Sequence, residues 1–188
     1  MVSYYYGFAD KLKKSKETAR FQLEQLSTNF PNCKIEIGTK AEDLMGIDYK
    51  ITQPGGHIIN VDGKIREEGC SRFWSTGPEL ALEIWSILPG GKFNTPQHDA
   101  KVGWTLDDAK QTDLVLHSYH PNDTSEYFLL KFLTYKETFR YNITKWKKQY
   151  KHPIQTSDSW QSQCIFIPAK TVVEAIRTFE TSGAKSLW

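Results

Sequence analysis

The sequence lacks several features that would place it in a specialised class of protein. It has only three cysteines in 188 residues (Cys33, Cys70 and Cys164), and none are in CxxC spacing. That pattern argues against a disulfide framework or a zinc knuckle, and for the reduced thiols of the cytosol. No apolar run approaches the roughly 18 residues that a membrane helix needs. The first residues lack the apolar core and cleavage site of a signal peptide. We therefore expect a cytoplasmic protein that does not contact a membrane.

The sequence also lacks a large excess of positive or negative charge. Lysine and arginine number 24 against 22 acidic residues, giving a net charge of +2 and a pI near 8.3. This balance neither demands nor excludes nucleic acid as a partner, so the placement of charge matters more than its sum. The G-x-S-x-G, P-loop and G-x-G-x-x-G motifs are absent, which leaves triad hydrolases and nucleotide-binding folds without support. The length fits one domain, residues 1–188.

Hydrophobic periodicity predicts an α/β fold, with a central mixed β-sheet flanked by helices. A β-hairpin is expected where two strand-like runs flank the turn Gln53-Pro54-Gly55-Gly56. Thr105 is the expected N-cap of a short helix. The segment 80–88 reads as a strand, although a helix of that length is an alternative. Helices are predicted at 8–30, 105–111, 136–150 and 171–181, and strands at 34–37, 47–52, 57–66, 80–88, 114–118, 127–133 and 164–167.

The predicted hairpin carries the residues with the clearest chemistry. Asp48 lies on its first strand, and Asp62 and Lys64 lie on its second. Side chains two positions apart on a strand share a face, so Asp62 and Lys64 point together and Asp48 can approach them. Two carboxylates with a backbone carbonyl form a hard-oxygen site suited to Mg²⁺ or Mn²⁺. A metal there would activate water and polarise a phosphate, and Lys64 would stabilise the charge that develops.

This arrangement resembles the PD-(D/E)XK, or restriction-endonuclease-like, nuclease superfamily. The resemblance rests on Gly46-Ile47-Asp48-Tyr49, the turn, and Val61-Asp62-Gly63-Lys64-Ile65-Arg66. It implies that Asp48, Asp62 and the Gly63 carbonyl bind the metal and that Lys64 is catalytic. Family members often add a glutamate from the first helix, a place that Glu24 matches. Glu17 and Glu83 are alternatives for this additional acid.

The resemblance implies a restriction-endonuclease-like fold and a divalent-metal-dependent hydrolase of DNA phosphodiester bonds, most simply an endonuclease. The small size is typical of a phage or mobile-element enzyme, which would act in the host cytoplasm. A homodimer is the usual requirement for cutting two strands in this family, and the sequence leaves the oligomeric state open. It also leaves open DNA or RNA, duplex, branched or single-stranded substrate, and endonuclease or exonuclease action. The alternative is an inactive nucleic-acid- or protein-binding module on the same fold.

A basic and aromatic segment follows from residue 136 to residue 151. Helical spacing predicts that its aromatic residues face the core while its basic residues face solvent or the phosphate backbone of DNA. A purely solvated helix face is the simpler alternative. The basic residues expected to contact nucleic acid are Lys136, Arg140, Lys145, Lys147 and Lys148.

Three other polar residues need an explanation. Glu83 lies inside an apolar run, where it could join the metal site, pair with Arg66 or Arg72, or lie on an exposed face. His117 and His120 flank a dipeptide without a third ligand at zinc spacing, which favours a polar strand end over a metal site.

Overall fold

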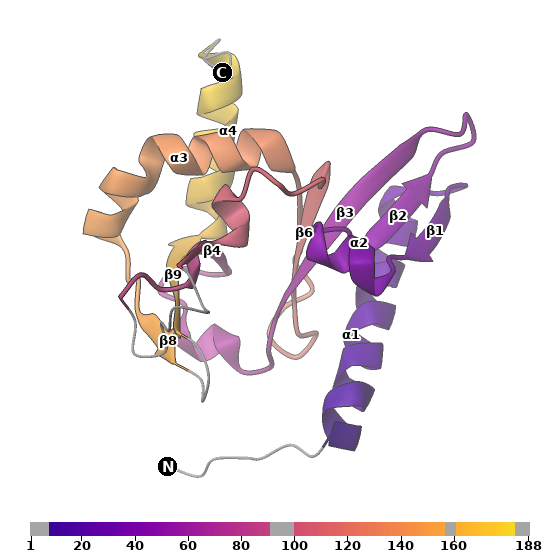
Figure 1. Cartoon of the computed structure of the whole chain (residues 1–188), viewed down its shortest axis with the longest axis horizontal. Helices are drawn as coiled ribbons and strands as arrows, with labels where there is room; N and C mark the ends of the chain where they lie inside the picture. Colours follow the sequence, from indigo (N-terminus) through magenta and orange to yellow (C-terminus); the bar gives the residue numbers. More distant parts are fainter. Residues whose placement is uncertain (1–7, 91–99, 157–160, 183–188) are drawn as a thin grey trace.

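The computed structural model describes residues 8–90, 100–156 and 161–182, and the side chains from residue 19 onward together with that of Glu17. Two sheets form the described part of the molecule (Figure 1). A mixed five-strand sheet lies on the right of the view with helices α1 and α2. A four-strand antiparallel sheet lies on the left with helices α3 and α4. The α/β class is therefore confirmed, and the second sheet is an addition that the sequence did not predict.

The five-strand sheet has the order β1-β2-β3-β6-β7. Antiparallel pairing joins β1 to β2 and β2 to β3, so the predicted hairpin is confirmed. Strand β3 then pairs in parallel with β6, with Asp62 opposite Val115 and Lys64 opposite His117. The elements of this half are α1 (Phe8–Asn29), β1 (Lys34–Ile37), α2 (Lys40–Leu44), β2 (Tyr49–Thr52), β3 (Ile58–Arg66), β6 (Leu114–Tyr119) and β7 (Phe128–Lys131).

The four-strand sheet has the order β5-β4-β9-β8, and its two central strands, β4 and β9, pair over most of their length. Residues of both sheets and of both C-terminal helices share the larger core, which includes Leu82, Val115, Phe139 and Ile165. This shared core fixes the two sheets against each other. The elements of this half are η1 (Cys70–Phe73), β4 (Glu79–Ile87), β5 (Lys101–Val102), η2 (Trp104–Leu106), α3 (Phe132–Gln149), β8 (Ile154–Thr156), β9 (Gln161–Pro168) and α4 (Ala169–Thr181).

Most predicted elements are present within a few residues, including the strand at 80–88. The helix predicted at 105–111 is wrong, because this segment contains only the single 3₁₀ turn η2. Thr105 is not its N-cap. Its buried hydroxyl instead accepts a hydrogen bond from the Glu83 N–H at 3.0 Å. The cysteines are free thiols, as expected. No helix in the described ranges is long and apolar enough to cross a membrane.

Helix α1 packs against the five-strand sheet directly over Gly63. Leu26 is fully buried in a second core with Tyr49 and Val61, and Gln22 is 3% exposed. A Cβ at position 63 would lie 2.6 Å from the Gln22 Oε1 atom and 3.0 Å from the Tyr49 ring. A side chain at residue 63 would therefore force the buried Gln22 and Tyr49 side chains to move.

Gly63→Ala should lower the free energy of unfolding by about 1 to 3 kcal/mol, because the new methyl group overlaps buried atoms. Urea denaturation followed by circular dichroism measures this loss. Gly55→Ala is the matched control, since no atom lies within 4 Å of its added Cβ. Adding Gln22→Ala should make the pair less destabilising than the sum of the two single changes. Additive losses would contradict the proposed contact.

Candidate functional site

Asp48 and Asp62 lie side by side where strand β2 begins. The Asp48 Oδ2 atom accepts a hydrogen bond from the Gly63 N–H at 2.7 Å. The N–H and C=O of one strand residue point to the same edge of the strand, so the Gly63 carbonyl also faces the Asp48 side. The structure therefore brings Asp48 together with Asp62 and with the Gly63 N–H.

Asp62 is the most buried carboxylate of this group, with 1% of its surface exposed. Its Oδ1 atom lies 2.6 Å from the Lys64 Nζ atom, and its Oδ2 atom is buried without a hydrogen-bond partner. A buried carboxylate oxygen without a donor is costly. The pair with Lys64 offsets part of the charge and leaves one oxygen available for a further ligand.

The pKa of Asp48 is raised from its ordinary value to about 6. Burial is the largest cause, followed by the hydrogen bond and charge of the neighbouring Asp62 carboxyl. The Gly63 N–H and the Lys64 charge act in the opposite direction but do not cancel these effects. The two carboxyl groups therefore form a like-charge pair that a cation would relieve.

Lys64 is held between this pair and an aromatic ring. Its Nζ atom lies 4.6 Å from the centre of the Trp104 ring, and its side chain is about one-third exposed. Trp104 is held in turn by Glu83, whose Oε2 atom accepts hydrogen bonds from the Trp104 N–H at 2.9 Å and the Ser86 hydroxyl at 2.6 Å. Glu83 thus supports the site through Trp104, a role that the sequence interpretation missed.

His117 borders the site as a buried, neutral side chain. Its pKa is lowered to about 3 by burial first and by the charges of Lys64 and Arg66 second. Its Nε2 atom lies 3.1 Å from the Tyr135 hydroxyl. No group of three or more His, Cys, Asp or Glu side chains placed to hold a metal occurs in the described ranges. The polar strand end predicted for His117 differs from the structure, because His117 lies within β6 and is only 4% exposed.

Glu24 is not brought to the site. Its side chain is 63% exposed and pairs with Arg20 at 3.2 Å, and Glu17 is also exposed. Helical periodicity gives the physical reason, because the residues of α1 that face the sheet include Gln22 and Gln25. Gln22 lines the same cleft as Asp48. Its Oε1 atom accepts a hydrogen bond from the Tyr49 hydroxyl at 3.0 Å. A buried amide at helical spacing is the only sequence signal that could have indicated it.

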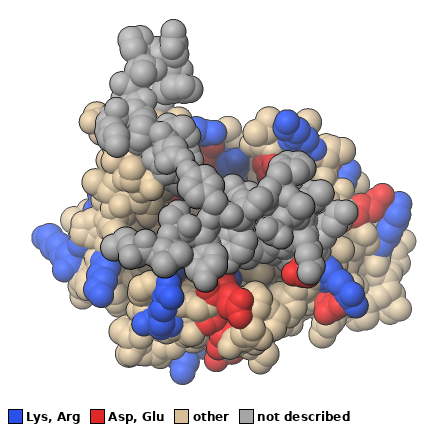
Figure 2. All heavy atoms as spheres, turned by 90° about the horizontal axis from the view of Figure 1, so that it is seen from below, with Lys and Arg blue, Asp and Glu red and all other residues tan. Residues whose placement is uncertain are grey.

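The basic residues of α3 divide into two groups. Lys136 is buried and lies 2.8 Å from Asp108, and Arg140 pairs with the same carboxylate at 2.7 Å. These two cations are neutralised within the protein. In contrast, Lys145 and Lys148 are exposed and Lys147 is half-buried. Basic and acidic side chains are interspersed over the described part of the face in Figure 2.

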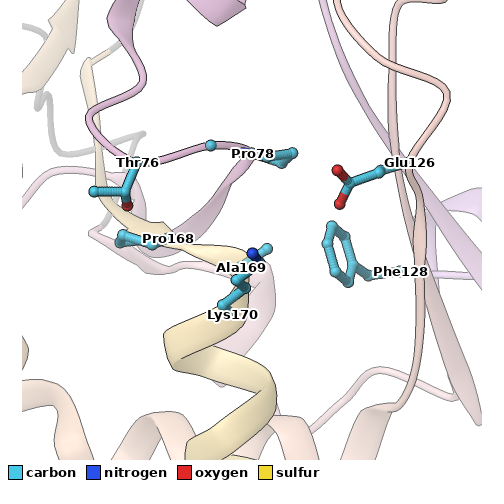
Figure 3. A pocket seen from close by; sticks show the side chains of 8 residues that line it. Thr76, Pro78, Glu126, Phe128, Pro168, Ala169 and Lys170 are labelled. Carbon is cyan, nitrogen blue, oxygen red and sulfur yellow. The ribbon is translucent and has the colours of Figure 1, made fainter.

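Two hollows differ in their relation to the site. An open cleft of about 760 Å³, including solvent at its mouth, is lined by Asp48, Gly63, Gln22 and Lys40, between α1, α2 and the sheet. A smaller hollow of about 240 Å³ lies at the start of α4 between Pro168 and Phe128 (Figure 3). Its lining contains no residue of the hairpin, whereas the first hollow reaches Asp48.

The donor set fits a hard divalent cation. The Asp62 Oδ2 atom, the Asp48 carboxylate and the Gly63 carbonyl would supply the oxygen ligands. The raised pKa of Asp48 reflects the excess of negative charge there. Water would complete the coordination, as is common for Mg²⁺.

Comparison with protein-family models, with curated proteins and with solved structures finds no match for this chain. The family resemblance therefore rests on the short motifs Gly46-Ile47-Asp48-Tyr49 and Val61-Asp62-Gly63-Lys64-Ile65-Arg66.

Asp48→Asn should change the pH dependence of stability in metal-free buffer. A raised carboxyl pKa stabilises the folded state below pH 4, and this contribution is lost as pH rises towards 6. The lowered pKa of His117 has the opposite effect, because its contribution to the free energy of unfolding grows as pH rises over the same range. Removing the Asp48 titration should make the unfolding free energy rise more steeply between pH 4 and 6. The gain at pH 7.5 should be about 1 to 3 kcal/mol.

Urea denaturation at several pH values measures the profile. Glu174→Gln, an exposed change on α4, should reproduce the wild-type curve. If the free energy of unfolding of Asp48→Asn changes with pH in parallel with the wild type, charge repulsion between Asp48 and Asp62 does not destabilise the folded protein.

Proposed function

We propose that this protein is a divalent-metal-dependent nuclease of the restriction-endonuclease-like type that hydrolyses phosphodiester bonds, most simply in DNA. The observation that carries the proposal is the contact of Asp48, Asp62 and Lys64 at the start of the hairpin. The element order supports it, since a helix precedes an antiparallel β1-β2-β3 unit and β3 then pairs in parallel with β6.

Mg²⁺ or Mn²⁺ is the cofactor that suits this site. Asp48, Asp62 and the Gly63 carbonyl would hold the ion, which when bound supplies Lewis-acid activation of water and phosphate. The Gly63 N–H fixes the Asp48 carboxylate at 2.7 Å, so this ligand is already oriented. Burial of Asp62 keeps competing water from its unpartnered oxygen.

Lys64 would stabilise the negative charge that develops on the phosphate. Its ammonium group is directed by the Asp62 Oδ1 atom and by the Trp104 ring, and it remains partly exposed to a substrate. His117 stays neutral above about pH 3 and so adds no competing positive charge beside it. The chain thus supplies one oriented cation on the same strand face as the buried carboxylate.

A second candidate is a non-catalytic nucleic-acid- or protein-binding module on the same fold. The position of Glu24 favours it, because the exposed Glu24 supplies no additional acid at the site. Metal binding separates the two candidates. A metal-competent site should gain thermal stability with increasing MgCl₂ or MnCl₂, whereas an inactive module should not.

Asp62→Asn should lower the rate of Mg²⁺-dependent cleavage by at least about 10²-fold, since it removes a metal ligand. The assay is a panel of linear, circular, branched and single-stranded DNA, with RNA as a further substrate, each with Mg²⁺ or Mn²⁺. Glu174→Gln serves as the matched control at an exposed carboxylate. Cleavage by Asp62→Asn at the wild-type rate would overturn the assignment of this site.

Exchanging Lys145 and Lys148 for glutamine should weaken DNA binding, because both side chains are exposed on α3. Each lost phosphate contact should reduce the slope of log affinity against log salt by about one. Fluorescence anisotropy with a DNA duplex measures the slope. Thr144→Ser, an exposed neutral change on the same helix, is the control. An unchanged slope would mean that Lys145 and Lys148 do not contact DNA and that this face of α3 is only solvated.

A further inference from the structure

Arg66 continues the row of charged side chains on strand β3. Alternate residues of a strand share a face, so Arg66 lies with Asp62 and Lys64, roughly 7 Å beyond Lys64 along the strand. Its position is fixed by the parallel pairing with β6, where it lies opposite Tyr119. A polymer held at Asp62 and Lys64 and running along β3 would therefore reach Arg66 next.

The Arg66 guanidinium has no acidic partner among the described residues. It stacks over the Phe166 ring at 4.7 Å, and its Nε atom is buried without a hydrogen-bond partner. A partly buried cation that forms no ion pair is costly. Stacking leaves the in-plane N–H groups of arginine at the edge of the ring, where the Cys70 thiol makes one weak hydrogen bond with Arg66. Such N–H groups match phosphate oxygens in pairs.

An open cleft lies beside Arg66. Its volume is about 760 Å³ including solvent at the mouth, and Gln155 of β8 lines it together with Arg66 and Arg72. Arg72 is exposed and lies 4.7 Å from the ring centre of Phe73, itself 65% exposed. The cleft thus combines two arginines with an exposed aromatic ring, which suits a nucleic-acid strand.

Two acidic residues reduce the positive charge of this cleft. Glu67 and Glu68 also line it, and the Glu68 carboxylate accepts a hydrogen bond from the Asn122 amide at 2.6 Å. Their charge offsets that of the arginines, so free phosphate should bind weakly. A phosphate in a strand already held at Asp62 and Lys64 binds better, because the second contact is then intramolecular.

We propose that Arg66 and Arg72 form a phosphate-binding subsite that holds the strand next to the scissile position. The polymeric ligand rests on the proposed nuclease function, whereas recognition of the phosphate group by Arg66 does not. The subsite would fix the direction in which a strand crosses β3.

The test compares variants in an Asp62→Asn background, where cleavage does not interfere. Arg66→Met keeps the packing of the side-chain stem and removes its charge, and Arg72→Gln changes an exposed residue without threatening the fold. Each should weaken binding of a short DNA single strand roughly tenfold at low salt. Each should also reduce the salt slope by about one. The affinity of the Arg66→Lys variant for the DNA strand should lie between that of Arg66→Met and that of the Asp62→Asn parent. Arg177→Gln, an exposed arginine on α4, should match the parent.

A second measurement does not depend on nucleic acid. Inorganic phosphate should raise the unfolding temperature of the wild-type protein above that in KCl of equal ionic strength, and Arg66→Met should remove this rise. Loss of phosphate protection without any nucleic-acid binding would support the subsite and refute the nuclease proposal. Salt slopes for both variants equal to that of Arg177→Gln would overturn the subsite, even if Mg²⁺-dependent cleavage persists. Absence of both phosphate protection and nucleic-acid binding would overturn both proposals.

Discussion

The contact between the Asp48 and Asp62 carboxyl groups is the constraint on which the site depends. Two acids this close and this buried repel each other, and the raised pKa of Asp48 reflects that cost. The protein offsets part of it with the Gly63 N–H on Asp48 and the Lys64 ammonium on Asp62. The Gly63 contact requires the β2–β3 register, because a slip of one residue would turn Asp62 and Lys64 to the face opposite Asp48. The hairpin therefore serves to hold an unfavourable pair of charges in place.

The second sheet is connected to this pair through a short chain of contacts. Lys64 lies against Trp104, the Trp104 N–H donates to Glu83, and Glu83 belongs to β4. The connection is tight, since a Cβ on Gly103 would lie 2.2 Å from the Glu83 carbonyl oxygen. Glycine at 103 thus lets the segment cross β4, much as glycine at 63 lets α1 cross β3. The four-strand sheet therefore positions the catalytic candidate Lys64, although it supplies no carboxylate to the pair.

Local pattern was sufficient to predict α1, the hairpin and the shared face of Asp62 and Lys64, because each depends on residues close in sequence. The strands β5 and β8 were not predictable in this way. They have two and three residues, and pairing with β4 and β9 rather than periodicity forms them. Long-range contacts also explain why the ion pairs of Lys136 and Arg140 were not predicted. Asp108 pairs with both, although it lies 28 and 32 residues earlier in the chain.

The unsatisfied groups on β3 are opposite in character and lie on one face. Asp62 presents a buried oxygen without a donor, and Arg66 presents a buried N–H without an acceptor. The two residues are four positions apart, which separates their backbones by roughly 13 Å, so neither can satisfy the other. A cation at the first position and an anion at the second would relieve both costs together. A phosphodiester strand with its divalent counter-ion has this alternation of charge, and a neutral His117 between the two leaves the pattern intact.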